Sequence, residues 1–223
     1  MNFELTGPLS DQLVSSLVVI VFLGIVIIIT GIRVGKLKPT DTPKGLLLVF
    51  VLFFEAVLNL IKPHFSGKKL KVFGPYLTAV LLYLVFANTV SLFGLKTPAS
   101  NAGIAACCSI MTYIMLRFAN IRFKGIKQKL RDFLGRIWYM FPIMIPINLI
   151  GEFSTPLTMG LRLFGNMISG LVISTMVYAV LNWVAGIFAG VFLHVVFDIF
   201  FGLIQAFVFF MLSVVNISMA TEK

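Results

Sequence analysis

Five stretches of this chain are apolar over a length that can cross a lipid bilayer, and this feature limits the possible fold more than any other. A helix needs about 20 apolar residues to span the hydrocarbon core, where its backbone must hydrogen-bond internally. The sequence therefore predicts an all-α integral membrane protein with residues 1–223 as one membrane domain. The stretches are residues 13–32, 75–95 and 101–117, and the two halves of a long run, 138–219, that turns near Asn182.

Composition supports the membrane class. Of the 223 residues, 59% are hydrophobic and 12% are charged, whereas soluble domains are about a quarter charged. The net charge of +10 lies in short loops between apolar segments, so we interpret it as a topology signal and expect no nucleic-acid partner. The first residues include Glu4 and Asp11 and are polar and acidic, unlike the basic start of a signal peptide. The first apolar segment is therefore expected to remain in the protein.

The basic residues predict which loops face the cytoplasm. Eight of the 18 lysines and arginines lie between residues 33 and 71, and seven lie between 117 and 136. The positive-inside rule places both stretches in the cytoplasm, including a basic loop at 118–136. The short apolar segment 45–61 has basic flanks on both sides, so we expect it to be re-entrant or interfacial. Five crossings then place the N-terminus outside and the C-terminus in the cytoplasm.

The final run, 138–219, is too long for two upright helices. Its first half would extend about 65 Å as a helix, whereas the hydrocarbon core is about 30 Å thick. Prolines at 142, 146 and 156 offer places to bend. We therefore expect five membrane-crossing helices plus one re-entrant or interfacial helix, with the last two crossing helices forming a long, strongly tilted hairpin.

One arginine, Arg162, lies near the middle of its apolar stretch and is expected to be buried. An arginine at that depth costs roughly 2.5–3.5 kcal/mol on insertion scales and stays protonated. We expect it to serve the function, although a pairing with a buried carboxylate that merely joins helices would also explain it. Three- and four-residue steps place four polar neighbours on the same helix face: Thr155, Thr158, Asn166 and Ser169.

Small residues and a second charge accompany this stripe. Gly160, Gly165 and Gly170 would let a neighbouring helix approach closely, although ordinary membrane packing uses glycine in the same way. Glu152 lies ten residues before Arg162, which is about 15 Å along a helix and well off the face of the arginine. We expect this carboxylate to wet a passage toward the arginine and not to neutralise it directly.

The last apolar stretch carries its own polar stripe. His194, Asp198, Gln205 and Asn216 fall within about 40° of one face of an α-helix. Such a stripe can exist in lipid only against protein or water. Asp198 is the best candidate for a protonatable relay, and the alternative is an ion pair with Arg162 or another helix. His194 fits a relay and a hydrogen-bonded packing residue equally well.

Motifs of catalysis and cofactor binding are absent from the sequence. It contains no Walker A motif, no HExxH and no GxSxG. The adjacent Cys107 and Cys108 match no metal-ligand spacing. We therefore expect no catalytic residue, no nucleotide site, no cofactor and no metal in this chain.

Two motifs resemble those of a known family. The run GLRLFGNM, residues 160–167, resembles the signature of subunit a of the F-type ATP synthase. The run LIQAFVF, residues 203–209, is similar to the second signature of that family. The two motifs in this order, near the end of the chain, are highly specific, and the resemblance extends over most of the sequence.

The resemblance implies a non-catalytic, ion-translocating stator subunit in the plasma membrane of a bacterium. In that family the long hairpin lies against a rotating ring of subunit c, and two offset aqueous half-channels connect the arginine to the two sides of the membrane. Further implied partners are subunit b of the peripheral stalk, the other ATP synthase subunits and the lipid bilayer. The translocated ion is a proton, with Na⁺ as the alternative, because residues of the ring set that choice.

The same resemblance implies roles for individual residues. Arg162 would be the essential arginine that drives deprotonation of the ring carboxylates. Asp198 would be a half-channel relay, and Glu152 would line the path that leads to the cytoplasm. Asn166 and Gln205 would be polar companions of the arginine. The predicted ion-translocation residues are together Arg162, Asn166, Asp198, Gln205, Glu152, His194, Ser169 and Asn88.

Departures from the family pattern leave the outer half-channel open. Leu171 stands where many relatives carry a glutamate, and some of those have a histidine where Asp198 stands, so we expect one acid to suffice here. Ser91 stands where some bacterial members have an acid after the asparagine that matches Asn88.

Two other classes of protein compete with this interpretation. A self-contained channel or secondary transporter would need a substrate pocket within this chain, and such transporters often contain inverted repeats, which this sequence lacks. A structural membrane anchor would leave Arg162 and Asp198 unexplained.

Overall fold

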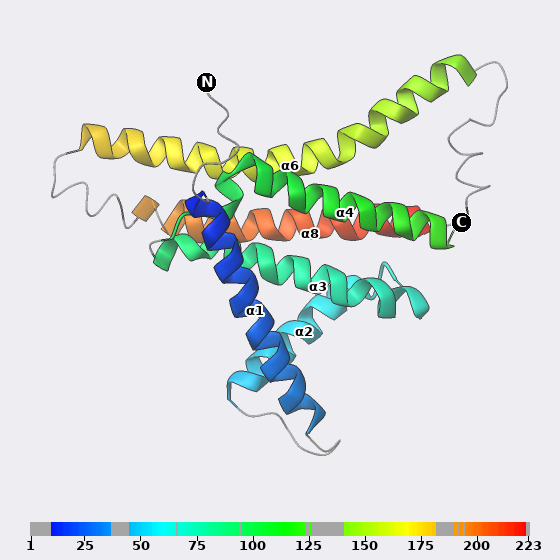
Figure 1. The fold of residues 1–223 in the computed structure, drawn as a ribbon, viewed down its shortest axis with the longest axis horizontal. Helices are drawn as coiled ribbons and strands as arrows, with labels where there is room; N and C mark the ends of the chain where they lie inside the picture. The colour runs from blue at the N-terminus through cyan, green and yellow to red at the C-terminus, as the bar shows by residue number, and fades with distance from the viewer. Residues whose placement is uncertain are drawn as a thin grey trace. The chain divides into compact units, whose positions relative to one another are not determined.

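The structure is a computed structural model in which every described element is helical (Figure 1). The chain divides into two compact units, residues 1–98 and 99–223, where the sequence predicts one membrane domain. The first unit holds helices α1 (Asp11–Gly35), α2 (Leu46–Ile61) and α3 (Lys68–Thr89), followed by a 3₁₀ turn, η1 (Val90–Phe93). After the short turn η2 (Pro98–Ser100), the second unit holds α4 (Ala102–Phe123), α6 (Phe141–Val180), the π-helical segment η4 (Val195–Phe201) and α8 (Gly202–Thr221). The described residues are 10–36, 45–65, 67–93, 95–123, 125, 141–181, 190, 192–193 and 195–221.

The predicted fold class is confirmed. Within the described ranges, five helices are long and apolar enough to cross a membrane, and one shorter apolar helix, α2, accompanies them. The 16 residues of α2 extend about 24 Å, which is less than the thickness of the hydrocarbon core. On its surface Glu55 and Asn59 are both exposed, and the Lys62 ammonium group donates a hydrogen bond of 2.8 Å to the Asn59 side-chain oxygen.

Two glycines set the entrances to helices in the first unit. Gly45 precedes α2 with φ of 65°, and Gly67 precedes α3 with φ of 55°. Residues with a side chain rarely adopt this left-handed region, because Cβ then approaches the backbone. These glycines therefore allow the sharp changes of chain direction that bound the short helix α2.

Apolar packing and one buried hydroxyl pair join α1 to α3. Val19 and Leu23 of α1 form a buried cluster with Val90, and the ring of Phe86 packs against it. Beside this cluster the hydroxyl groups of Ser16 and Tyr83 are hydrogen-bonded at 2.8 Å. The pair satisfies two polar groups that lipid could not satisfy, so it fixes the rotation of α1 against α3.

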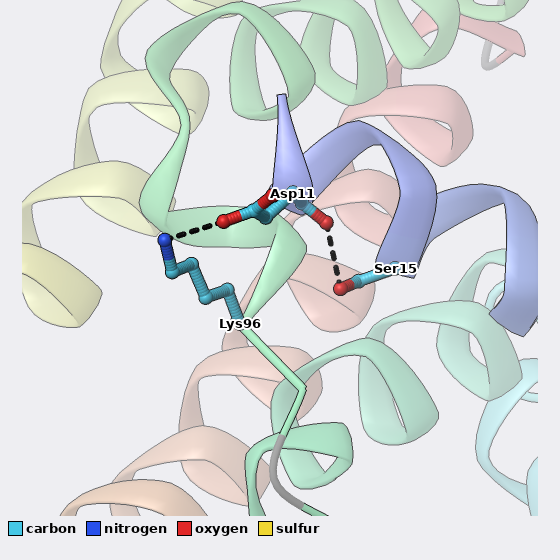
Figure 2. Close-up of polar contacts among 3 residues, drawn as sticks. All are labelled: Asp11, Ser15 and Lys96. Atoms are coloured by element: carbon cyan, nitrogen blue, oxygen red, sulfur yellow. Dashed lines mark hydrogen bonds and ion pairs between the residues drawn. The ribbon is translucent and has the colours of Figure 1, made fainter. Parts of the chain in front are cut away.

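An ion pair joins the beginning of α1 to the segment that follows η1. The Lys96 ammonium nitrogen lies 2.6 Å from a carboxylate oxygen of Asp11, and the Ser15 hydroxyl donates to the Asp11 main-chain carbonyl at 2.9 Å (Figure 2). Both charged side chains are largely exposed. The start of α1 and the segment after α3 therefore meet at the same end of the first unit.

Helix α6 is the longest element and is continuous over its 40 residues despite Pro146 and Pro156. At that length it extends about 60 Å. Figure 1 shows that it bends along its course and that α8 runs back alongside it in the opposite direction. The last two long helices thus form the predicted hairpin, and the tilt of this hairpin in a bilayer stays a prediction. The turn near Asn182 lies outside the described residues.

Close approaches at two glycines position the hairpin. A Cβ atom added at Gly160 would lie 2.8 Å from the Ser109 hydroxyl and 3.5 Å from the Ala105 carbonyl of α4. A Cβ atom at Gly170 would lie 3.1 Å from the Phe197 ring of η4. The prediction that small residues admit neighbouring helices is therefore confirmed at these two positions. At Gly165 nothing lies within 4 Å, so that glycine faces open space.

Helix α4 is longer than the apolar pattern predicts. The sequence places the end of this span at residue 117 and a loop at 118–136, whereas α4 continues to Phe123. Arg122 is therefore a helical residue and not a loop residue, and Arg117 lies within the helix and not at its end. The rest of the basic stretch, apart from Gly125, lies outside the described residues.

Candidate ion-translocation site

Arg162 lies on the outside of the second unit, in the second half of α6. Its side chain is exposed within this chain, and its predicted depth in the membrane stays a prediction. Among the residues that the structure describes, no carboxylate forms an ion pair with it. A permanent charge in the middle of an apolar helix is thus presented outward and is not neutralised by this part of the chain.

The predicted polar stripe of α6 is present around this charge. Thr158, Asn166 and Ser169 are exposed like Arg162. The Ser169 hydroxyl donates to the main-chain carbonyl of Gly165 at 2.7 Å, one turn earlier. Because this hydroxyl is satisfied within its own helix, the stripe can lie in apolar surroundings at low cost.

Asn166 and Gln205 are brought together by the hairpin, as the sequence analysis expects of two companions of the arginine. The Asn166 amide nitrogen donates to the Gln205 side-chain oxygen at 2.6 Å. Gln205 is 2% exposed, and its amide nitrogen has no hydrogen-bond partner in the described part of the chain. The pair ties α8 to α6 one turn beyond Arg162.

The stripe of α8 faces protein at two of its four predicted positions. Besides Gln205, Asn216 directs its amide nitrogen to the Met159 sulfur of α6 at 3.9 Å. The backbone of Asp198 lies in η4, and the side chain of Asp198 and the whole of His194 lie outside the described residues.

The π-helical segment changes the geometry of this stripe. Residues Val195–Phe201 form a π-helix, whose wider turn rotates the chain less per residue than an α-helix does. The regular α-helical step that puts Asp198 and Gln205 on one face therefore does not apply over this segment. Nothing in the amino-acid pattern marks the wider turn, although such turns are frequent at functional sites.

Glu152 has a partner that the sequence analysis missed. Its carboxylate lies 2.5 Å from the Arg117 guanidinium of α4, and that guanidinium lies 4.5 Å from the centre of the Tyr113 ring. The apolar pattern ends the span at Arg117, whereas this residue lies within α4. The four-residue spacing of Tyr113 and Arg117, next to apolar neighbours on both sides, is the signal that could have indicated a helical position.

Asn88 is placed in the first unit, whereas the other candidate residues belong to the second. It is fully buried in α3, with 0% of its surface exposed. Ser91 follows in η1, where its hydroxyl is buried without a hydrogen-bond partner. A role for Asn88 therefore stays a prediction.

A groove of about 400 Å³ runs between α4 and α6. Its walls are almost entirely apolar, with Tyr113, Phe153, Gly160 and Phe164 among them, and Arg162 does not line it. A passage for ions needs polar walls, so this groove is not a candidate half-channel. Among the described residues there is also no group of three metal-ligating side chains.

The fold and the site define a class of protein: a multi-pass α-helical membrane protein that presents a permanent positive charge on a long helical hairpin. The family model described as ATP synthase A chain matches residues 13–218. This chain therefore belongs to the ATP synthase A chain family, which confirms the resemblance to subunit a of the F-type ATP synthase.

Individual bacterial relatives agree with this assignment. The chain is 29% identical over 214 residues to ATP synthase subunit a of Solidesulfovibrio magneticus, covering 96% of this chain and 87% of the relative. It is 29% identical over 223 residues to ATP synthase subunit a of Staphylococcus aureus, covering 93% of this chain and 89% of the relative. A third relative, from Sulfurihydrogenibium, is 33% identical over 138 residues, covering 61% of this chain and 66% of that ATP synthase subunit a.

Proposed function

We propose that this chain is the ion-translocating stator subunit of a rotary F-type ATP synthase, which couples ion flow to rotation of a ring of subunit c. The observation that carries the proposal is the exposed position of Arg162, in the apolar middle of α6 and without a carboxylate partner among the described residues. A cation at bilayer depth needs a counter-charge. Carboxylates on the ring supply that charge.

The chemistry follows from the fixed charge. A protonated ring carboxylate that arrives opposite Arg162 releases its proton, because a nearby opposite charge favours the ionised form. The arginine does not give up its own proton and also repels free protons, so it blocks a direct leak between the half-channels. The ion gradient then biases rotation, since one charge moved through 100 mV is worth about 2.3 kcal/mol.

Other residues of the hairpin serve the two half-channels in this proposal. Asp198, four residues after His194, relays protons to or from the ring. Glu152 lies along the path from the cytoplasm. Asn166 and Gln205 support the arginine through their hydrogen bond of 2.6 Å. The chain itself is non-catalytic, and its partners are the ring, the peripheral stalk of subunit b and the remaining synthase subunits.

Cross-linking between α6 and the ring tests this proposal. Ile173 lies 11 residues after Arg162, about 20° from its helix face, whereas Leu171 lies about 160° away from Ile173. Both side chains are exposed, at 43% and 57%. In membranes with the assembled complex, Ile173→Cys should form a disulfide with a cysteine placed beside the ring carboxylate.

Leu171→Cys is the matched control for this experiment and should remain unlinked. Efficient cross-linking of Leu171→Cys but not of Ile173→Cys would mean that the arginine faces away from the ring. Purification of a functional lone oligomer of this chain, free of any small proteolipid, would favour the rival class of self-contained transporters.

Asp198→Asn should slow ATP-driven proton pumping by at least about tenfold while assembly is retained. The substitution keeps the shape of the side chain and removes the group that can bind and release a proton; general acid–base groups typically contribute 10²–10⁴-fold. The measurement is quenching of a pH-sensitive dye in vesicles, normalised to the amount of assembled complex. His194→Gln should have the smaller effect, and unchanged pumping by Asp198→Asn would assign that residue to packing.

The ion pair of Asp11 and Lys96 supports the proposed topology. Asp11 precedes the crossing of α1 and Lys96 follows the crossing of α3, yet the two charges lie 2.6 Å apart. Helices α1 and α3 then cross in opposite directions, and α2 does not cross. With a crossing α2, Lys96 would emerge on the other side of the membrane from Asp11.

Cysteine labelling in intact cells tests this topology. Lys96→Cys should react with a membrane-impermeant thiol reagent from outside, and Lys124→Cys should react only after the cytoplasmic side is opened. The native Cys107 and Cys108 are first replaced, so that only the introduced thiol is labelled. Labelling of Lys96→Cys from the cytoplasmic side alone would contradict the five-crossing arrangement.

A further inference from the structure

The contact of Arg117 with Glu152 is the one ion pair between α4 and α6 in the described part of the chain. The two side chains are 20% and 27% exposed, so both charges are largely withdrawn from the surface. A charge that is partly buried in apolar surroundings is costly unless an opposite charge and hydrogen bonds accompany it. Each member of this pair therefore depends on the other.

The guanidinium group of Arg117 is held from two sides. One side meets the Glu152 carboxylate, at 2.5 Å, and the Tyr113 ring lies 4.5 Å away, one helical turn earlier in α4. Stacking on an aromatic ring and binding to a carboxylate both use the planar shape of the group, which lysine lacks. This arrangement fixes the position of Arg117 and, through it, the position of Glu152.

Among the described residues, Glu152 has no comparable second partner. Helix α8, which packs against both α4 and α6, has no ionisable side chain between Gly202 and Thr221. The other arginine near this end of α4, Arg122, is exposed and forms no ion pair among the described residues. Arg117 is therefore the one cation in the described part of the chain that pairs with this carboxylate.

We propose that Arg117 is a positioning residue for the ion path: it holds the Glu152 carboxylate at the interface of α4 and α6 as a fixed charge. Glu152 then does not carry protons along the path, which distinguishes it from Asp198. This inference rests on the proposed function and refines the role of Glu152 within it. A fixed pair places two opposite charges between two apolar helices without adding a net charge to the path.

A double-mutant cycle in vesicles with the assembled holoenzyme tests the inference. Arg117→Gln leaves an unpaired carboxylate and should lower ATP-driven proton pumping per complex about tenfold, because a lone, partly buried charge is the costly state. Glu152→Gln should lower pumping less, by about threefold, since the arginine keeps its aromatic partner. The variant with both substitutions should recover most of the rate that Arg117→Gln loses.

A proton-carrying Glu152 would give the opposite order. Glu152→Gln would then abolish pumping, the double variant would be equally inactive, and Arg117→Gln would keep most of the activity. A loss confined to the amount of assembled complex, with an unchanged rate per complex, would also overturn the inference, because it assigns the pair to structure alone. If Arg117→Gln does not assemble, the double variant Arg117→Glu, Glu152→Arg, which exchanges the two charges, is measured instead. Pumping per complex near the wild-type rate would support the inference, and loss of pumping would contradict it.

Two controls separate this inference from the proposed function. Arg122→Gln removes the same charge from the same helix at an exposed position, and it should leave pumping unchanged. Arg162→Ala is measured in the same vesicles. If Arg162→Ala still pumps, the proposed function fails, whatever the variants of Arg117 and Glu152 show. If Arg162→Ala is inactive and Glu152→Gln also abolishes pumping, only the inference about Arg117 fails.

Discussion

Replacing Arg162 with alanine should abolish coupled ATP synthesis in complexes that still assemble. The side chain is exposed and forms no ion pair with a carboxylate that the structure describes, so we expect complexes without it to assemble. The loss is therefore one of function. Without the fixed positive charge nothing opposite the ring carboxylate favours its ionised form, so synthesis should fall to background.

Arg162→Lys tests whether any positive charge suffices at this position or whether the arginine side chain itself is required. Lysine keeps a positive charge but can lose its proton when it is desolvated, and it lacks the planar fork of donors. We therefore expect Arg162→Lys to be inactive as well, and Arg162→Ala alone to let protons pass without rotation. The measurements are ATP synthesis, ATP-driven pumping and passive proton conductance in the same vesicles. Near-normal ATP synthesis by Arg162→Ala would contradict the proposed mechanism.

The second large effect is expected at Gly160, where α6 approaches α4 closely. A leucine at this position has to displace α4, because even a Cβ atom would lie 2.8 Å from the Ser109 hydroxyl and 3.5 Å from the Ala105 carbonyl. Overpacking of this kind costs about 1–3 kcal/mol or more. Gly160→Leu should therefore reduce the amount of assembled complex in the membrane at least about tenfold, as measured by native electrophoresis.

Smaller substitutions show whether the close approach is the cause. Gly160→Ala should have a milder effect that Ser109→Ala relieves, since the atom in the way is the serine oxygen. Gly151→Leu in the same helix is the control, because nothing lies within 4 Å of a Cβ atom there. Equal loss of complex in Gly151→Leu and Gly160→Leu would point to helix content and not to packing against α4.

The number and type of helices could be predicted from the sequence because apolar length is a local property. Asn166 and Gln205 each belong to a polar stripe that the sequence shows, whereas their place beside the arginine was implied by the family resemblance. The hydrogen bond between them joins residues 39 positions apart, and the hairpin makes that meeting possible. The two recognised motifs therefore carried information on tertiary structure that periodicity alone does not contain.

Other features depend on tertiary contacts and could not be read from the pattern. The end of α4 was placed at the first charge, Arg117, but a charge that pairs with Glu152 across the interface does not end a helix. The exposure of Arg162 depends on which side of α6 is covered by α4 and α8. The π-helical course of η4 likewise has no signature in its residues.

The exposed contact of Asp11 with Lys96 has a consequence for how the protein is made. An ion pair at the surface contributes only about 0–1 kcal/mol, which is too little to move an apolar helix through a bilayer. Its members are 85 residues apart, so α1 is synthesised well before Lys96. The lysines and arginines that follow α1 and flank α2 must therefore commit the chain to its orientation during synthesis. The contact between Asp11 and Lys96 is then a result of the orientation of the helices and not its cause.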